Sequence, residues 1–398
     1  MGVDVLRLLV EARPAPDLGD EVDARLALLL ADFCACVRAS DDEAVRGAST
    51  DGTSGLAAAT ARAGSLRDLD DVDWRSMHHP GSVVWPVVLA LSVEVRASGR
   101  HLRHAAWSGY TTAATVADVL GSEHRAVWHV TATAGALGAA HAAGVMLGLT
   151  REQQTCAMAL AAGNAGGLVQ AARERRGAAV FNRVAAVTLG LASARAAAWG
   201  AVTIKNAFDD MRDAMSPGTK PEAVAVRDGV LDAAPRLFPV SGFLQSAVIG
   251  AAECRSSLGG DLRGITLGLP SGVLPLVSGD AAPAWWDARL AVLRAWAHAD
   301  PHASATPSSL DERRDLVQLE AADVPPGSAR LSALTELTSG AVDCIGPPTL
   351  GSPGIHEALR SKWQRVLAID PDPPYELARL ALTETGPAYD TKEVWWTL

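Results

Sequence analysis

Apolar residues recur every three or four positions through most of the first 200 residues, a spacing that places side chains on one face of an α-helix. The clearest case is the stretch 21–37, which follows Asp20, a residue suited to cap a helix. Its apolar face would carry Val22, Leu26, Leu29, Leu30, Phe33 and Val37. Similar patterns predict helices over 56–63, 83–95, 101–120, 134–147, 152–164 and 181–199.

Several of these predicted helices are rich in alanine and glycine, which allow helix axes to approach closely. Gly99, Gly121 and Gly148 stand where three of the helices would end. Short axis-to-axis distances of this kind are typical of an all-α bundle.

The pattern changes after Leu237-Phe238-Pro239. Helices are expected over 244–258, over 285–296 with an aromatic face, and again from 354 onward. Strands are expected over 262–269 and 272–277. The segments 315–320 and 329–337 are predicted to pair as antiparallel strands, because Pro325-Pro326-Gly327 between them is typical of a turn.

These patterns predict a mainly α protein of two parts. A large all-α helical domain would cover 1–234, and a smaller inserted α+β lid domain would cover 235–340. A C-terminal segment over 341–398 would return to the helical domain.

Composition narrows the class of protein. The 398 residues are 48% hydrophobic and 20% charged, which is globular. A net charge of −10 argues against nucleic acid or an anionic membrane as the main partner, and favours a small-molecule substrate. The first residues carry no apolar signal-peptide core, and the uncharged stretch 131–149 is mostly alanine and glycine, so neither secretion nor a membrane span is expected. The five cysteines lack a disulfide or metal spacing, which favours reduced thiols in the cytoplasm.

Two histidines are candidates for acid–base chemistry. His79 precedes Pro80-Gly81, a turn just before a predicted helix, and His129 likewise precedes a predicted helix start. Histidine is the usual side chain for proton transfer near neutral pH, and helix N-termini favour a carboxylate or an enolate. Either histidine could instead pack or cap at its turn, and the spacing does not establish that they converge.

An acidic run precedes His79, formed by Asp68, Asp70, Asp71 and Asp73. It could be a solvated loop with helix caps, or one of its members could orient a histidine or act as the base. The acids alone could hold a metal, but the run has no pattern of a calcium-binding loop. The chain has no phosphate-binding loop, dinucleotide fingerprint or zinc-peptidase motif, so no cofactor is expected.

Two groups of cations could hold an anionic substrate. One is the cluster Arg173, Arg175 and Arg176, which could equally be a solvated surface. The other is Arg236, at the junction of the two predicted domains, where a pocket would form.

The order of these motifs resembles the MmgE/PrpD family, whose members include 2-methylcitrate dehydratase and cis-aconitate decarboxylase. The resemblance runs through nearly the whole chain and is strongest from 66 to 168. It rests on Asp68-Leu69-Asp70-Asp71, His79-Pro80-Gly81, Gly109-Tyr110, His129 with Thr133-Ala134-Gly135, the small-residue stretch 161–168 and Phe238-Pro239.

The resemblance implies a helical domain with a smaller lid, a homodimer, and metal-free lyase chemistry in a cleft. Carried over to this chain, it implies catalytic roles for Asp68, His79 and His129. Asp71 and Tyr110, within the matching motifs, would contact substrate together with Arg236 and Arg176.

This chain departs from the family pattern mainly at positions where the family has lysine or histidine side chains. Ala178 and Phe181 stand where the family has a lysine and a histidine, and Arg236 replaces a second lysine. Val72 stands where a threonine is usual, and Leu244, Gln245 and Ser246 stand where histidines are expected. Desolvating a polycarboxylate costs several kcal/mol unless cations meet it. The substrate is therefore expected to be larger or more neutral, as in a specialised biosynthetic pathway.

The leading hypothesis is a cofactor-independent enzyme that performs β-elimination or decarboxylation by proton transfer next to a carbonyl or carboxylate. One of His79 and His129 would remove a proton and the other would protonate the leaving group or the carbanion. An isomerase, epimerase or cyclase of a natural-product intermediate is the first alternative. A non-catalytic relative, in which the two histidines share no cleft, is the second.

Overall fold

The computed structural model describes residues 4–12, 18–40, 52–174, 178–202, 205–219, 224–278, 286–303, 312–370, 378 and 382. The chain divides into two compact units. The first unit comprises Met1–Ala234 with Ile369–Leu398, and the second comprises Pro235–Ala368.

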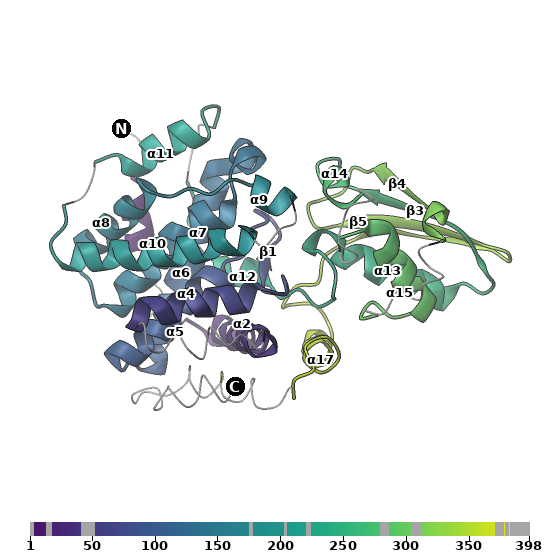
Figure 1. Cartoon of the computed structure of the whole chain (residues 1–398), viewed down its shortest axis with the longest axis horizontal. Coiled ribbons are helices and arrows are strands. Elements are labelled where there is room, and N and C mark those ends of the chain that lie inside the picture. The colour runs from purple at the N-terminus through teal and green to yellow at the C-terminus, as the bar shows by residue number, and fades with distance from the viewer. Residues whose placement is uncertain are drawn as a thin grey trace. The chain divides into compact units, whose positions relative to one another are not determined.

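The first unit is built of helices, which confirms the mainly α class (Figure 1). They are α1 (Val5–Glu11), α2 (Asp20–Ala39), α4 (Gly52–Ser65), α5 (Gly81–Val95), α6 (Gly99–Val127), α7 (Val130–Met146), α8 (Arg151–Ala162), α9 (Gln170–Arg173), α10 (Ala178–Ala198), α11 (Ala207–Met215) and α12 (Gly229–Asp232). Six of the seven helices predicted for this unit match within about four residues at each end, α6 runs further than expected, and α1, α9, α11 and α12 were not predicted.

Helix α7 is the centre of this unit, and it contacts α5, α6, α8 and α10. Nearly all of its residues are buried, which explains why it shows no polar face. Glycines make the contacts close: a Cβ on Gly138 would lie 2.7 Å from the carbonyl oxygen of Gly109, and one on Gly190 would lie 2.5 Å from the Cβ of Ala139. Small residues therefore bring α6 and α10 against α7 at short range.

Helix α6 continues beyond its expected end. Gly121 has φ 71° and ψ −164°, a left-handed conformation that bends the helix there, and helical structure resumes as far as Val127. The Ser216 hydroxyl donates to the carbonyl oxygen of Leu120 at 2.7 Å, and the Gly218 amide donates to the Glu123 carboxylate at 3.0 Å. The glycine thus produces a kink rather than a helix end, because contacts from a distant segment hold the next turn.

A two-stranded antiparallel sheet joins two distant parts of the first unit. Strand β1 (Val72–Asp73) pairs with β2 (Ala233–Ala234). The end of the acidic run is therefore tied to the residues at which the chain leaves the first unit for the second.

The second unit is α+β. Its sheet has the order β4-β3-β5-β6. Strand β3 pairs in parallel with β4 and antiparallel with β5, and β5 pairs antiparallel with β6. Helix α13 contacts β5, β6 and α15. The elements are α13 (Gln245–Ser257), β3 (Leu262–Leu269), α14 (Leu274–Val277), α15 (Ala288–His298), β4 (Val317–Ala321), β5 (Ala329–Thr335), β6 (Ser339–Ile345), α17 (Ile355–Ser361) and a π-helical turn (Lys362–Val366).

Two strand predictions for this unit are wrong. The segment 272–277 contains the short helix α14, because Pro275 lacks an amide hydrogen for a sheet and fits the first turn of a helix. Strands β4 and β5 run in opposite directions but do not pair with each other, since the apolar strand β3 lies between them. The sheet also extends past residue 340 through β6.

No helix among the described residues is both long enough and apolar enough to cross a membrane. Among the described residues, four buried cysteines stand outside any disulfide, and they are Cys34, Cys36, Cys156 and Cys254.

The close packing of α10 on α7 predicts that Gly190→Ala destabilises the protein. The new Cβ would meet main-chain atoms of Ala139 and Ala140 within 3 Å, and these atoms cannot move aside without shifting α7. We expect the free energy of unfolding, measured in urea, to fall by about 1–3 kcal/mol despite the higher helix propensity of alanine. Gly166→Ala, where a Cβ would meet nothing within 4 Å, is the control and should be nearly neutral. Equal stability of the two variants would contradict the close packing.

Candidate active site

The main chain around Asp71 holds His79 at the start of α5. The His79 amide donates to the hydroxyl of Thr131, in the first turn of α7, at 3.1 Å. The His79 Nδ1 atom lies 2.7 Å from the main-chain carbonyl oxygen of Asp71. A carbonyl oxygen only accepts, so Nδ1 carries the proton in this contact and the neutral ring has its lone pair on Nε2.

The Asp71 carboxylate is buried against the N-terminus of the same helix. Its Oδ1 accepts from the Gly81 amide at 2.8 Å, and its Oδ2 accepts from the Tyr110 hydroxyl at 2.7 Å. Burial raises the pKa of Asp71 to about 7, although the hydrogen bonds from Tyr110 and Gly81 oppose the shift. Both carboxylate oxygens thus accept from protein donors, and the Tyr110 hydroxyl is buried with them.

His129 is the residue that precedes α7, as the sequence predicts. Its amide donates to the carbonyl oxygen of Gly167 at 2.9 Å, and about nine-tenths of the residue is buried. Burial, followed by the charge of Arg183, lowers the pKa of His129 to about 3, so the imidazole is neutral at physiological pH. Its Nδ1 atom is buried and has no hydrogen-bond partner among the described residues.

Arg183, on α10, is the cation that sequence reasoning missed. Its guanidinium lies 3.2 Å from the Asp68 carboxylate and 3.6 Å from the Asp70 carboxylate, and its side chain is only 4% exposed. Asp70 in turn lies 3.9 Å from Nδ1 of His79. One signal could have found it: Arg183 is the only charged residue between 178 and 194, in a helix otherwise rich in apolar residues.

Asp68 has an unusual backbone conformation, with φ 52° in the left-handed region. Such values are uncommon outside glycine, although aspartate tolerates them better than most residues. Asp68 is the first residue of the acidic run, and its ion pair with Arg183 orients the carboxylate at this bend of the chain.

Five of the seven predicted site residues belong to one region of the first unit. Asp71 and Tyr110 bond to each other, Asp71 bonds to His79, and the charges of Asp68 and Arg183 act on His129. Of the other two, Arg236 is a buried residue of the second unit, and Arg176 lies outside the described residues.

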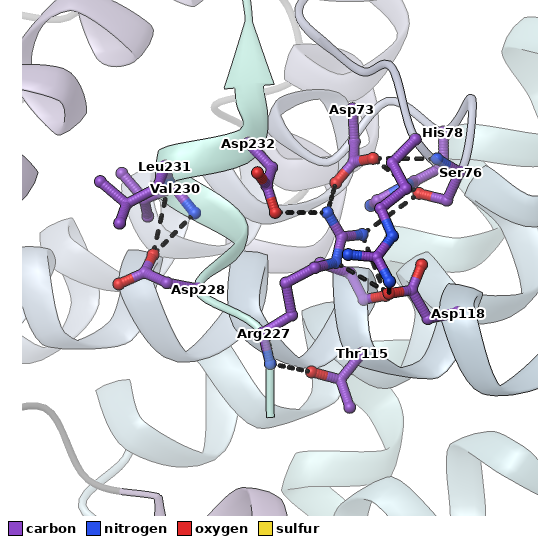
Figure 2. A network of polar contacts seen from close by, with 12 residues as sticks. Asp73, Ser76, His78, Thr115, Asp118, Arg227, Asp228, Val230, Leu231 and Asp232 are labelled. Atoms are coloured by element: carbon purple, nitrogen blue, oxygen red, sulfur yellow. Dashed lines mark hydrogen bonds and ion pairs between the residues drawn. The ribbon is translucent and has the colours of Figure 1, made fainter. Parts of the chain in front are cut away.

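A neighbouring network fixes the turn that leads into His79 (Figure 2). Arg227 is at its centre and contacts the carboxylates of Asp73 at 2.6 Å, Asp118 at 3.0 Å and Asp232 at 2.7 Å. The Asp73 carboxylate also accepts from the amide and the hydroxyl of Ser76. The network ties β1 to α6 and to the segment before α12.

His78 belongs to this network. Its Nδ1 lies 2.7 Å from the Ser76 hydroxyl, and its side chain is fully buried. Burial lowers the pKa of His78 to about 4. The two adjacent histidines thus differ in role: His78 packs in the turn, while His79 lies beside the acidic run.

Among the described residues, no group of three or more histidine, cysteine, aspartate or glutamate side chains is arranged to hold a metal ion.

Comparison with known families gives one match. The family model of the MmgE/PrpD N-terminal domain matches residues 38–223, a range that contains His79, His129, Arg183 and the whole acidic run. No curated protein matches the chain.

The Arg227 network predicts a large loss of stability for Arg227→Met. Although burial raises the pKa of Asp73, His78 and Arg227 hold it below its ordinary value. Removing the guanidinium leaves the buried Asp73 carboxylate unpaired, which typically costs about 3–5 kcal/mol. Arg212→Met on α11 is a matched control, because Arg212 pairs with the more exposed Asp209 and Asp213. We expect the control to change the free energy of unfolding by less than about 1 kcal/mol, and a similar loss in both variants would contradict the assignment.

The buried histidines predict that the protein loses stability in mild acid. Burial lowers the pKa of His78, His124 and His141 to about 4 and that of His129 to about 3. The unfolded chain would protonate them near pH 6.5, so stability is complete above that value and falls as the pH drops toward 4. Asp71, with its raised pKa, binds a proton in the folded state and offsets one of these four. Burial also lowers the pKa of His302 and raises that of Asp118, and these two shifts act on stability in opposite directions. The pH dependence of the free energy of unfolding should therefore approach three protons.

Urea titrations between pH 5 and 8 measure that slope. His141→Gln removes one histidine from the sum, because the His141 ring lies in the core beside the Thr112 hydroxyl. The variant should reduce the slope by about one proton. A stability that does not depend on pH in this range would show that the histidines are not buried in their neutral form.

Proposed function

The chain belongs to the MmgE/PrpD family, and we propose that it is a cofactor-independent enzyme of lyase type that transfers protons next to a carbonyl or carboxylate group. The family includes lyases such as 2-methylcitrate dehydratase. The observation that carries the proposal is the single cluster in which Asp70 contacts both His79 and Arg183, while the Arg183 charge acts on His129.

His129 is the proposed base. A neutral imidazole has a lone pair to accept a proton, and burial beside Arg183 keeps this imidazole neutral. His129 would remove the proton from the carbon next to the substrate carbonyl, leaving an enolate. In a dehydration, this carbanion expels the hydroxyl group of the neighbouring carbon.

His79 is the proposed acid. Its Nδ1 proton is held by the Asp71 carbonyl, so the proton it exchanges with substrate is on Nε2. The Asp70 carboxylate, 3.9 Å away, favours the charged imidazolium by Coulomb attraction. Protonated His79 would give its Nε2 proton to the departing hydroxyl group, releasing water. In a decarboxylation, it would protonate the carbanion left by loss of carbon dioxide.

The charges of the cluster favour a substrate that is neutral or carries one negative charge. Asp68 and Asp70 together place two carboxylates on the single guanidinium of Arg183. A polycarboxylate substrate would meet net negative charge there, and no cation of the cluster would offset the cost of removing its carboxylates from water. Binding of one substrate carboxylate by Arg236 or Arg176 stays a prediction from the sequence.

Exposed apolar residues in the segments next to His129 support the same substrate class. Leu168 and Val127 are about half exposed, and Phe181 is 69% exposed. Leu168 follows Gly167, whose carbonyl oxygen binds the His129 amide, and Asn182 donates to the Leu168 carbonyl oxygen. An apolar portion of a natural-product intermediate could pack on these residues.

The second candidate is an isomerase, epimerase or cyclase on the same cluster. The neutralisation of Arg183 by two aspartates favours it, because such reactions need the histidines but no cation to hold a leaving carboxylate. Solvent deuterium entering the substrate without loss of water or carbon dioxide would identify this class.

The proposed function predicts that His79→Gln and His129→Gln each lower turnover by about 10²–10⁴-fold, the usual cost of losing an acid–base group. Substrates would be 2-methylcitrate, cis-aconitate and a panel of neutral or singly charged β-hydroxy and β-keto carbonyl compounds. His101→Gln is the control, because His101 bonds to the carbonyl oxygen of Val145 through Nε2 and belongs to α6. Circular dichroism establishes that each variant is folded.

These measurements test the roles of the histidines and the substrate preference separately. A loss below about tenfold in both variants would contradict the acid–base assignment. High activity on methylcitrate or cis-aconitate would overturn the expected preference for neutral or singly charged substrates, while leaving the roles of the histidines in place.

A further inference from the structure

Three hydrogen bonds converge on one residue beside His79. The Asp71 carbonyl oxygen binds the ring of His79, and the Asp71 carboxylate binds the Gly81 amide and the Tyr110 hydroxyl. All three distances lie between 2.7 and 2.8 Å, and Asp71, Gly81 and Tyr110 are buried. The side chain and main chain of one residue therefore connect α6 to the imidazole.

We propose that Asp71 and Tyr110 are positioning residues that set the tautomer of His79, holding its proton on Nδ1 so that Nε2 exchanges protons with substrate. The sequence pattern assigned both residues to substrate binding. Their polar atoms are instead engaged with one another and with the start of α5.

The geometry explains how Tyr110 acts at a distance. The Tyr110 ring packs edge-on against Trp85 of α5, with ring centroids 6.1 Å apart, so its hydroxyl is a fixed point. A Cβ on Gly81 would lie 2.6 Å from Asp71 Oδ1 and 2.7 Å from the Tyr110 oxygen, which leaves room only for glycine. The carboxylate is thus held from two sides, and the carbonyl group of the same residue keeps its direction toward His79.

This role requires the shape of the Asp71 side chain but not its charge. An asparagine would still accept from the Gly81 amide through its carbonyl oxygen, and its amide group would donate to the Tyr110 oxygen. Alanine removes both contacts, and phenylalanine at 110 removes one. A purely structural role predicts only changes in stability, whereas the positioning role also predicts a change in the position of the ring proton.

The tautomer is read by two-bond ¹⁵N–¹H correlation spectra of the full-length protein labelled with ¹⁵N-histidine, with the His79 signals assigned from His79→Gln. The unmodified protein at pH 8 should show the proton on Nδ1. Tyr110→Phe and Asp71→Ala should shift the tautomer population toward Nε2–H by about tenfold, the effect of one ordinary hydrogen bond. Asp71→Asn should keep the original population.

Thr112→Val is the matched control. It also removes a buried hydroxyl of α6, but that hydroxyl lies 2.7 Å from Nδ1 of His141. This variant should alter the His141 signals and leave those of His79 unchanged, while Tyr110→Phe should do the reverse.

The importance of the tautomer for turnover rests on the proposed function, but the spectra do not. On any substrate found in the panel, Tyr110→Phe should lower kcat about tenfold with little change in KM. A protonated Nε2 in the neutral ring of the unmodified protein would overturn the proposal, even if no variant folds. So would an unchanged His79 tautomer in folded Tyr110→Phe, or a change confined to KM. If His79→Gln stays active while the tautomer shifts as expected, the proposed function fails and the positioning role stands.

Discussion

The burial of an acidic run is the constraint on which the candidate site depends. Asp70, Asp71 and Asp73 are each at most 5% exposed, and a carboxylate cannot leave water without a partner that replaces its hydration. Each of the three carboxylates has a different set of partners. Asp70 contacts Arg183, Asp71 accepts from the start of α5 and from Tyr110, and Asp73 contacts Arg227. Because the partners come from separate elements, the acidic run joins parts of the first unit that are distant in sequence.

The close packing of the helices makes these contacts possible. Glycine and alanine on α7 and α10 allow the two helices to approach, and the charge of Arg183 on α10 acts on His129 at the start of α7. The same packing buries His129 and holds it neutral. The protonation state of this candidate base therefore follows from helix packing as well as from the residue type, since an exposed imidazole at the same position would titrate near pH 6.5.

Local patterns predicted the helices well and the sheet less well. A helix such as α2 leaves a regular apolar spacing and a polar first turn, so its extent follows from its own residues. The sequence of a strand carries no comparable signal that tells which other strand it pairs with. The segment 315–320 and the turn at 325–327 are compatible with a hairpin, but the apolar strand β3 inserts between the two strands and gains partners on both edges. Local patterns also could not predict the kink at Gly121, because contacts from residues 216 and 218 hold the helical turn beyond it.

The sequence by itself determined the helical class, the location of His79 and His129 at helix starts, and the presence of an acidic run between them and the N-terminal helices. These follow from spacing and turn chemistry, which act over a few residues. Only the tertiary structure decided which cation meets which acid. Arg183 is 115 residues from Asp68, and Arg227 is 154 residues from Asp73. Such pairs depend on where whole helices pack, and a charge in a sequence carries no information about its partner until the fold brings the two together.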